Sequence, residues 1–304
     1  MSLSKIAKSG VPPRAVIVRR PSPYEQLLAR HGTAGQARFF LESRGRTLGT
    51  LEGEHQALEK ALFTVLDAIP TGWRRARIER RDLASFTFEP SDVVVAVGQD
   101  GLVANVARFV QGQPVIGVNP LPDRFPGVLV PHPPKDAKLL LRDAARGAAP
   151  ISPRTMVQVA LDDGQHLRAL NEVFLGHSSH QSARYRLTVG ASSERQSSSG
   201  LIVSTGTGAT GWAASILKAR GRPLALPAPG DRRLAWFVRE AWPGGGLGAD
   251  LIEGVLDQGA VEVVSEFETG GVIFGDGIEA DHLAFGWGQT ARISVAADPL
   301  NWVG

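Results

Sequence analysis

The chain contains no cysteine among its 304 residues. This absence excludes a disulfide framework, a thiolate metal site and a cysteine nucleophile, and it is typical of proteins from a reducing compartment. Long apolar runs are absent too. No stretch approaches the roughly 20 residues of a membrane span, and the polar N-terminus, which begins Met1-Ser2-Leu3, lacks the apolar core of a signal peptide. We therefore expect a cytoplasmic protein with no membrane partner.

A large excess of one charge sign is absent as well, because 33 Lys and Arg residues nearly balance 30 Asp and Glu residues and leave a formal net charge of +3. The apolar fraction of 43% and the mean hydropathy of −0.05 are those of a globular protein with a sizeable core. Arginines gather between Trp73 and Arg81. We interpret them as a solvated face; a nucleic-acid surface is the alternative, but no RNA- or DNA-binding motif accompanies them, and we expect no nucleic-acid partner.

Strand and helix patterns alternate in the N-terminal part of the chain. Residues 92–97 are almost continuously apolar, as in a parallel strand buried on both faces, and residues 102–110 and 115–118 follow as a helix and a second buried strand. This βαβ unit predicts a Rossmann-like α/β domain with a parallel sheet. Further strands are expected at 14–19 and 75–78, and helices at 24–30, 36–44 and 55–69.

Beyond residue 137 the pattern changes to short strands separated by Gly-, Ser-, Pro- and Asp-rich turns. We expect a second, β-rich domain interrupted by one helix near 212–218, with residues 131–148 as the approach to it. The polar stretch 192–199 reads as a mobile hairpin end. The expected strands are 156–161, 167–175, 185–189, 200–204, 234–240, 260–265, 271–274 and 291–295.

The first candidate site follows the buried strand 92–97 and reads Gly98-Gln99-Asp100-Gly101. Ligands of α/β folds bind at the carboxyl ends of parallel strands, and the start of the next helix presents N–H groups to an anion. Asp100 would repel phosphates, so it makes sense there as a cation ligand or as the acceptor of a proton from an attacking hydroxyl. An ordinary turn, with the aspartate bonded to its own backbone, explains the spacing equally well.

Two more segments carry polar groups beside apolar strands. Residues 204–212 read Ser-Thr-Gly-Thr-Gly-Ala-Thr-Gly-Trp between a strand and a helix, and such hydroxyls and glycines at a helix start suit a polyphosphate. It is no Walker A loop, because it has no Gly-Lys-Ser/Thr. A helix capped by a threonine is the simpler interpretation, but it accounts only for Thr210. Asn171-Glu172 interrupts an apolar strand and needs partners if it is buried.

In this order, the three motifs resemble those of the NAD kinase family. That family carries Gly-Gly-Asp-Gly after a strand, then Asn-Glu or Asn-Asp, then a Ser-Thr-Pro-Thr-Gly-Ser-Thr-Ala-Tyr type of loop. The segment 114–119 is similar to the family's Gly-x-Asn step, and 270–277 to its late Asp-Gly turn. The resemblance covers about residues 92–304; Gly-Gly-Asp-Gly alone is shared with phosphofructokinases and diacylglycerol-type lipid kinases.

The resemblance implies an ATP-dependent kinase that phosphorylates the adenosine-ribose 2′-hydroxyl of NAD to give NADP, with Mg²⁺ screening the phosphates. It implies a two-domain fold, with an α/β domain at 1–136, a β-rich NAD-binding domain at 137–290 and a segment at 291–304 that returns to the first domain. Homodimers or homotetramers are usual in the family. Asp100 would be the base; no residue is expected to bind a structural metal. The implied NAD site comprises Gly101, Asn171, Glu172, Thr210, Gly211, Trp212 and Ser215. The implied ATP phosphate site comprises Gly98, Gln99, Asn119, Thr205, Gly206, Thr207 and Gly208.

The chain also departs from the family pattern. Gln99 replaces a glycine of the first motif and adds a side chain where a phosphate approaches, and Ala209 removes a hydroxyl from the third. Trp212 stands where the family has tyrosine, and Ser199 where it often has aspartate. Two other hypotheses therefore stay open: a kinase for a lipid or sugar hydroxyl, and a catalytically weakened NAD(P)-binding protein. The phosphoryl donor and the preference for NAD or NADH are not fixed by the sequence.

Overall fold

The computed structural model describes residues 12–304, which form two compact units. Unit 1 contains the chain up to Ser152 together with Asn301–Gly304, and unit 2 contains Pro153–Leu300. The units thus divide at Ser152 rather than at residue 136, and the returning segment is shorter than 291–304. The N-terminus, for which we expect no signal peptide, lies outside the described residues. None of the described helices is both long and apolar enough to cross a membrane.

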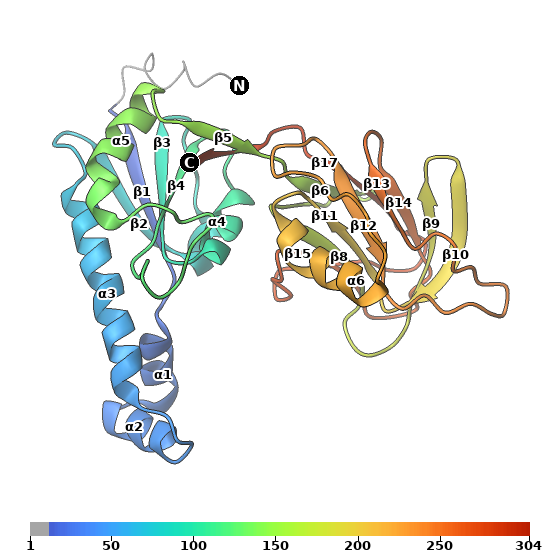
Figure 1. Ribbon diagram of the computed structural model, residues 1–304, viewed down its shortest axis with the longest axis horizontal. Coiled ribbons are helices and arrows are strands. Elements are labelled where there is room, and N and C mark those ends of the chain that lie inside the picture. The colour runs from blue at the N-terminus through green and yellow to red at the C-terminus, as the bar shows by residue number, and fades with distance from the viewer. Residues whose placement is uncertain (1–11) are drawn as a thin grey trace. The chain divides into compact units, whose positions relative to one another are not determined.

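Unit 1 is built on a six-stranded sheet in the order β2-β1-β3-β4-β18-β5 (Figure 1). The pairs β1–β2, β1–β3, β3–β4 and β4–β18 are all parallel, as the apolar run of β3 predicts, and every residue of β3 is buried. The strands are β1 (Arg14–Arg19), β2 (Arg74–Glu79), β3 (Asp92–Val97), β4 (Pro114–Val118), β5 (Ile151–Arg154) and β18 (Leu300–Val303).

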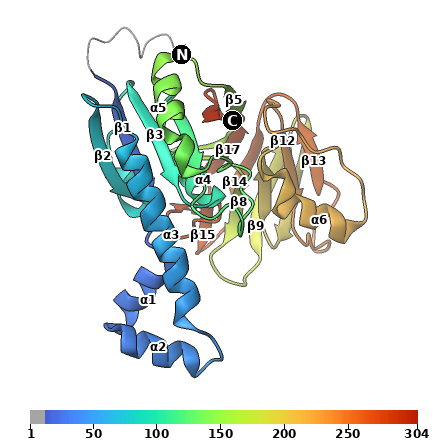
Figure 2. The same cartoon turned by 60° about the vertical axis from the view of Figure 1, so that its left-hand side comes forward.

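Helices cover both faces of this sheet (Figure 2). Successive side chains of a strand point to opposite faces. Val93, Val95 and Val97 share one core with α3 and α5, and α4 packs on the opposite face against β1, β3 and β4. The helices α1 and α2 form a smaller apolar cluster with the beginning of α3. The helices are α1 (Pro23–His31), α2 (Ala34–Glu42), α3 (Leu48–Asp67), α4 (Asp100–Ala107) and α5 (Ala137–Arg146).

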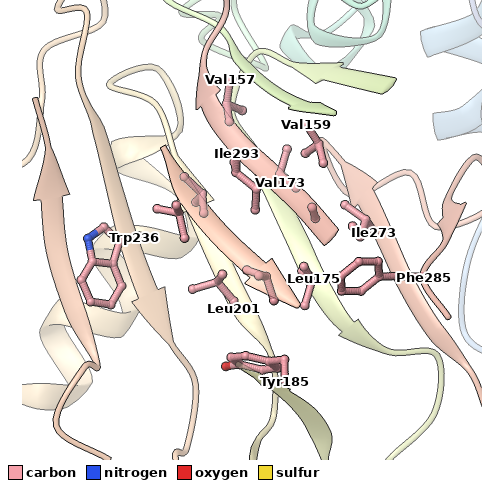
Figure 3. Packing of buried hydrophobic residues seen from close by; sticks show 14 of the residues in the cluster. Val157, Val159, Val173, Leu175, Tyr185, Leu201, Trp236, Ile273, Phe285 and Ile293 are labelled. Atoms are coloured by element: carbon pink, nitrogen blue, oxygen red, sulfur yellow. The ribbon is translucent and has the colours of Figure 1, made fainter. Parts of the chain in front are cut away.

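Unit 2 is a sandwich of two six-stranded sheets, in the orders β10-β9-β14-β17-β6-β7 and β13-β12-β11-β8-β15-β16. Side chains from both sheets, among them Val159, Leu175 and Ile293, fill a single core between them (Figure 3). The strands of the first sheet are β6 (Val157–Leu161), β7 (His166–Ala169), β9 (Ala183–Val189), β10 (Ser192–Ser198), β14 (Val261–Ser265) and β17 (Thr290–Val295). Those of the second are β8 (Glu172–His177), β11 (Leu201–Ser204), β12 (Leu234–Val238), β13 (Glu253–Leu256), β15 (Gly271–Gly275) and β16 (Leu283–Ala284).

The helix α6 (Trp212–Arg220) covers the outer face of the second sheet of unit 2. Its residues Ala213, Ile216 and Leu217 pack on Ala235 and Phe237 of β12. The side chains of α6 alternate between this apolar contact and solvent, which is the pattern that the sequence predicts for a surface helix. Because α6 begins directly after the Ser204–Gly211 segment, this packing fixes where that segment ends.

Three expectations from the sequence were wrong. The apolar stretch 167–175 is not one strand: β7 lies in the first sheet and β8 in the second, because the chain crosses between the sheets at Leu170 and Asn171. The stretch 192–199 is not a mobile end, since β10 pairs with β9 along its whole length. The approach at 131–148 contains α5, whose buried face joins the core of unit 1.

Candidate functional site

The loop after β3 places Asp100 at the first position of α4, with Gln99 as the residue before the helix. Neither Gly98 nor Gly101 adopts a left-handed φ, so the backbone conformation of the turn does not itself require these glycines. A methyl group at Gly98 would lie 3.2 Å from the Leu102 side chain, whereas one at Gly101 would meet nothing within 4 Å. Gly101 therefore leaves open space beside the helix start, where a phosphate can approach the N–H groups of the first turn.

The carboxylate of Asp100 accepts hydrogen bonds from the backbone of a loop that is distant in the sequence. It accepts hydrogen bonds from the N–H groups of Val128 (3.0 Å to Oδ2), Leu129 (2.8 Å to Oδ1) and Val130 (3.1 Å to Oδ1). A methyl group at Gly127 would lie 3.3 Å from Oδ1 and would collide with Val130. A carboxylate offers about four acceptor sites, so three such bonds leave room for one further partner. Asp100 is thus fixed in position and still able to accept one proton or one hydrogen bond.

A cavity of about 120 Å³ lies at the carboxyl ends of β1 and β3, next to the Asp100 loop. Gly98, Gln99 and Gly101 line it from one side, and Arg20 from the other. This is where a doubly wound sheet binds its ligand, because the helices that follow neighbouring strands there leave on opposite faces. Glu54 also lines the cavity, but Arg124 forms an ion pair with it at 2.6 Å, so Arg20 and the helix N-terminus favour an anionic ligand.

Asn119 follows β4 and is buried, with 4% of its surface exposed. Its Nδ2 donates to the Phe125 carbonyl at 2.7 Å, and its Oδ1 accepts from the Leu121 N–H at 2.9 Å. Both polar groups of the side chain therefore hold the loop between β4 and the Val128–Val130 segment. A direct contact with phosphate, as the sequence motif predicts, would require these bonds to be exchanged.

In unit 2, Asn171 and Glu172 lie where the chain leaves the first sheet and enters the second. Glu172 is the first residue of β8 and pairs with Ser204, the last residue of β11. The two motifs that the sequence separates by more than thirty residues therefore lie side by side. The crossing leaves the N–H groups of Leu170 and Asn171 outside any strand ladder, and both donate to the carboxylate of Asp276 instead.

The surroundings of Glu172 strongly perturb its carboxyl. Burial, and to a smaller extent the negative charge of Asp276, together raise the pKa of this carboxyl to about 7. A carboxyl with a pKa near 7 changes between hydrogen-bond donor and acceptor at neutral pH. Perturbed carboxyls of this kind gather at functional sites, which makes Glu172 the strongest candidate of unit 2.

The threonines of the third motif differ in whether their hydroxyls have hydrogen-bond partners. Thr205 is fully buried; its hydroxyl donates to the Leu170 carbonyl at 2.6 Å and accepts from the N–H groups of Thr207 and Gly208. The Thr207 hydroxyl is buried without any hydrogen-bond partner within the described part of the chain. A buried hydroxyl with no partner is costly unless a ligand or water binds it. Thr207, rather than Thr205, is therefore the hydroxyl available to a ligand.

The glycines of the third motif have a packing role. A methyl group at Gly206 would lie 2.0 Å from the Ala228 carbonyl oxygen, and one at Gly208 would lie 2.3 Å from the Asn171 carbonyl oxygen. Both contacts are with backbone atoms, which cannot rotate away. The predicted reason for these glycines, close approach of a phosphate, is therefore not needed: the Ser204–Gly211 segment must lie tightly on the residues that carry Asn171 and Glu172.

The first residue of α6, Trp212, stacks on Phe174 of β8 with ring centroids 5.8 Å apart and an angle of 12° between the planes. The guanidinium of Arg239 lies 5.2 Å from the centre of the Trp212 ring. These three side chains line a cavity of about 440 Å³ on the outer face of the second sheet, with histidines along its rim. Its size is that of a small-molecule site. Of the remaining predicted residues, Thr210, Gly211 and Ser215 are exposed near the start of α6.

The sequence did not indicate some of the residues that the structure places at these sites. The Val128–Val130 segment and Arg239 carry no motif of their own. The Asp276-Gly277 turn was interpreted only as a turn, although an aspartate before a glycine after a buried strand is a usable signal. Among the described residues, Glu25, His55 and Glu59 bring potential metal ligands within 4.8 Å of one another. Arg19 forms ion pairs with both glutamates and already compensates their charge, so we assign no metal to them.

No protein-family model matches the chain. Among curated proteins it is similar to "NAD kinase 2, mitochondrial" of Rattus norvegicus, with 28% identity over 257 residues that cover 67% of this chain and 60% of the relative. The human protein of the same name is 27% identical, with 58% of its length covered. The NAD kinase of Psychrobacter arcticus is 33% identical over 162 residues, which cover 51% of this chain and 47% of that protein. The chain thus spans about three fifths of the mammalian relatives.

Two solved structures resemble the whole chain. Yeast NADH kinase complexed with NADH matches with a TM-score of 0.59 at 14% identity, covering 97% of this chain and 84% of that one. An NAD kinase from Archaeoglobus fulgidus in complex with ATP matches with a TM-score of 0.56 at 18% identity, covering 96% and 93%. The chain shares their fold. An α/β unit and a β-rich unit are therefore the parts of a known two-domain arrangement, as the sequence predicts.

Proposed function

We propose that this protein is an NAD kinase, which transfers the γ-phosphoryl group of ATP to the adenosine-ribose 2′-hydroxyl of NAD. The observation that carries the proposal is Asp100: a carboxylate fixed by three backbone N–H groups at a helix start, beside a cavity at the carboxyl edge of a parallel sheet. The similarity to curated NAD kinases, which extends over 257 residues, supports the same function.

In the proposed reaction, Asp100 accepts the proton of the 2′-hydroxyl through its remaining lone pair. The hydroxyl oxygen forms a bond to the γ-phosphorus of ATP, the bond from that phosphorus to the β,γ-bridging oxygen breaks, and ADP leaves. Positioning and electrostatics do most of the work in phosphoryl transfer. The N–H groups at the start of α4 and Arg20 would hold phosphate oxygens, while Asn171, Glu172 and Thr207 would bind hydroxyl and amide groups of the dinucleotide.

Mg²⁺ is expected to accompany ATP. It prefers oxygen ligands, retains several waters and is usually held by one or two carboxylates together with substrate phosphates. The carboxylate that lines the cavity is that of Glu54, which also forms an ion pair with Arg124. Together with substrate phosphates and water it would hold the ion, and the open acceptor position of Asp100 remains for the proton. The ion would supply charge neutralisation on the phosphates. We also propose a homodimer or homotetramer, to be checked by light scattering of the purified chain; the cytoplasmic location stays a prediction, since the mammalian relatives are named mitochondrial.

The test is formation of NADP by the purified chain with NAD or NADH, Mg²⁺, and either ATP or polyphosphate. We expect NADP with ATP, and a loss of at least about 100-fold in kcat for Asp100→Asn, because a general base contributes about 10²–10⁴-fold. Asp123→Asn makes the same chemical change at an exposed position of a nearby loop and serves as the control. Circular dichroism and thermal melting establish that both variants fold.

Two outcomes would contradict the proposal. If none of these donors gives NADP but calorimetry shows tight NAD binding, the chain is a dinucleotide-binding protein that has lost turnover. Gln99, which lines the cavity next to Asp100, would then be the first residue to replace with glycine. If radiolabelled phosphate appears instead on a sugar or lipid hydroxyl, the kinase chemistry stands and the acceptor is wrong.

A further inference from the structure

The Asp-Gly turn after β15 binds the backbone that carries Asn171 and Glu172. Asp276 accepts the Leu170 N–H on Oδ2 at 3.0 Å and the Asn171 N–H on Oδ1 at 2.7 Å. Its own N–H donates to the Glu172 carbonyl at 3.0 Å. Three consecutive residues are therefore held by one side chain and its amide. Because Leu170 and Asn171 lie between β7 and β8, no strand ladder binds their N–H groups.

The turn is built for this contact. Asp276 has a φ of +54°, one of only two positive φ values among the non-glycine residues that the structure describes, and Gly277 follows at +68°. Aspartate tolerates this left-handed conformation better than most residues, yet it is a strained choice where glycine is available. A methyl group at Gly275 would lie 2.7 Å from the Ala169 side chain, so the turn approaches the crossing too closely for other residues. Because the left-handed conformation costs free energy at Asp276, we infer that its carboxylate has a function.

The negative charge of the same carboxylate also acts on that of Glu172. Two negative charges oppose each other, and both groups are partly buried, so water screens them weakly. Ser204, which pairs with Glu172 across β11, carries no charge. Asp276 is the charged group that acts on Glu172, and it shifts the protonation of Glu172 in the same direction as burial does.

We propose that Asp276 is a positioning residue, which fixes the Asn171–Glu172 backbone for dinucleotide binding and holds a negative charge against the Glu172 carboxyl. This rests on the proposed function, in which Asn171 and Glu172 bind the adenosine half of NAD. The charge keeps Glu172 able to donate as well as to accept near neutral pH, so that it can match a ribose hydroxyl in either sense.

The experiment compares Asp276→Asn with Asp163→Asn. The asparagine at 276 keeps the size of the side chain and tolerates a positive φ, but it loses the charge and one of the two accepted hydrogen bonds. Asp163 lies in a second Asp-Gly turn of the same unit, is exposed, and accepts from the Gln165 N–H at 3.0 Å. It therefore supplies the same substitution in a turn that is remote from the Asn171–Glu172 pair.

The first readout needs no substrate and no activity. In ¹³C-glutamate-labelled protein, the carboxyl signal that disappears in Glu172→Gln is titrated by NMR. We expect its midpoint to fall by at least one pH unit in Asp276→Asn and to stay unchanged in Asp163→Asn. A folded Asp276→Asn variant whose Glu172 midpoint equals that of the wild type would overturn the charge role, whether or not the chain makes NADP.

The second readout is kinetic. We expect Asp276→Asn to raise the KM for NAD by about ten-fold, with a smaller change in kcat, since a misplaced binding group weakens substrate binding. A purely structural role predicts lower thermal stability with an unchanged KM in the folded fraction, and that result overturns the positioning role. Asp276→Gly removes both the charge and the hydrogen bonds while relieving the backbone strain, and we expect an equal or larger rise in KM. Absence of NADP in the wild type would refute the proposed function alone, since the NMR titration would still test the charge.

Discussion

At the scale of single residues, the surroundings of the two candidate carboxylates have opposite effects on a negative charge. Asp100 is surrounded by N–H donors from Val128, Leu129 and Val130, which stabilise a negative charge. Glu172 is buried beside another carboxylate, and both influences oppose its negative charge. The hydrogen bonds hold the first as an acceptor, whereas the second changes its protonation near neutral pH.

The raised pKa of Glu172 predicts a particular pH dependence of stability. A glutamate in the unfolded chain titrates near pH 4.5, whereas Glu172 in the folded protein titrates at about 7. Its contribution to folding is therefore fully present below about pH 4.5 and is lost as the pH rises through about 7. Glutamine is neutral throughout, so Glu172→Gln should gain about 2 kcal/mol relative to the wild type between pH 5 and pH 8.

Urea unfolding of both proteins at pH 5 and pH 8 measures this difference. Glu268→Gln, at an exposed position of the same unit, shows the effect of the amide substitution alone. An equal stability gap between the wild type and Glu172→Gln at the two pH values would mean that the pKa of Glu172 is not raised. In the kinase assay, kcat/KM for NAD of the wild type should change with one proton near pH 7, and that change should be absent in Glu172→Gln.

At the scale of elements, the sequence predicted the site best where a local pattern alone determines the structure. The continuous apolar run of β3 defined the strand, and the loop that follows it therefore had to lie at the sheet edge. The sheet crossing at Leu170 was not predicted, because apolar side chains are required in both sheets and the polar pair Asn171-Glu172 was interpreted as an interruption within one strand. The serine-rich β10 was missed for a related reason: its pairing partner, β9, and the burial of Ser197 and Ser198 come from the tertiary fold.

Two glycines also show that a sequence pattern does not reveal which contacts a residue makes in the folded protein. The resemblance predicts ligand-binding roles for both Gly101 and Gly208, whereas the structure gives the two residues very different surroundings. Gly208→Ala would place a methyl group 2.3 Å from the Asn171 carbonyl oxygen, whereas Gly101→Ala meets open space in the first turn of α4. We expect Gly208→Ala to cost about 1–3 kcal/mol, the usual price of overpacking. Gly101→Ala should leave stability unchanged or raise it by up to about 1 kcal/mol, since alanine favours a helix.

The effects of Gly101→Ala and Gly208→Ala on substrate binding should differ from their effects on stability. If the space at Gly101 admits a phosphate, Gly101→Ala raises the KM for ATP in a fully stable protein. Gly208→Ala should instead alter NAD binding, because it displaces the residues that carry Asn171 and Glu172. Thermal melting and separate KM values for ATP and NAD decide this. An ATP KM that Gly101→Ala leaves unchanged would argue against phosphate contact at the start of α4.

At the scale of the whole chain, the last strand completes the first unit. β18 pairs in parallel with β4, and the Trp302 indole N–H donates to the Leu129 carbonyl at 2.9 Å across 173 residues of sequence. The N–H of the same Leu129 donates to Asp100. The C-terminus therefore supports the loop that holds the proposed base. The resemblance predicted a returning segment, but not that its final residues reach this loop.

Trp302→Phe tests this support, because it keeps most of the buried ring and removes only the N–H donor. The Leu129 carbonyl then loses a partner in a buried place, which costs about 1–2 kcal/mol. The loop should become more mobile, and kcat should fall several-fold although Trp302 touches no proposed substrate group. Trp287→Phe, at a tryptophan that is 65% exposed, is the matched control and should change stability by less than about 0.5 kcal/mol. Hydrogen exchange at the Val128–Val130 amides gives the direct readout. We expect faster exchange in Trp302→Phe than in the wild type, and equal exchange would show that the Trp302 N–H does not support the loop.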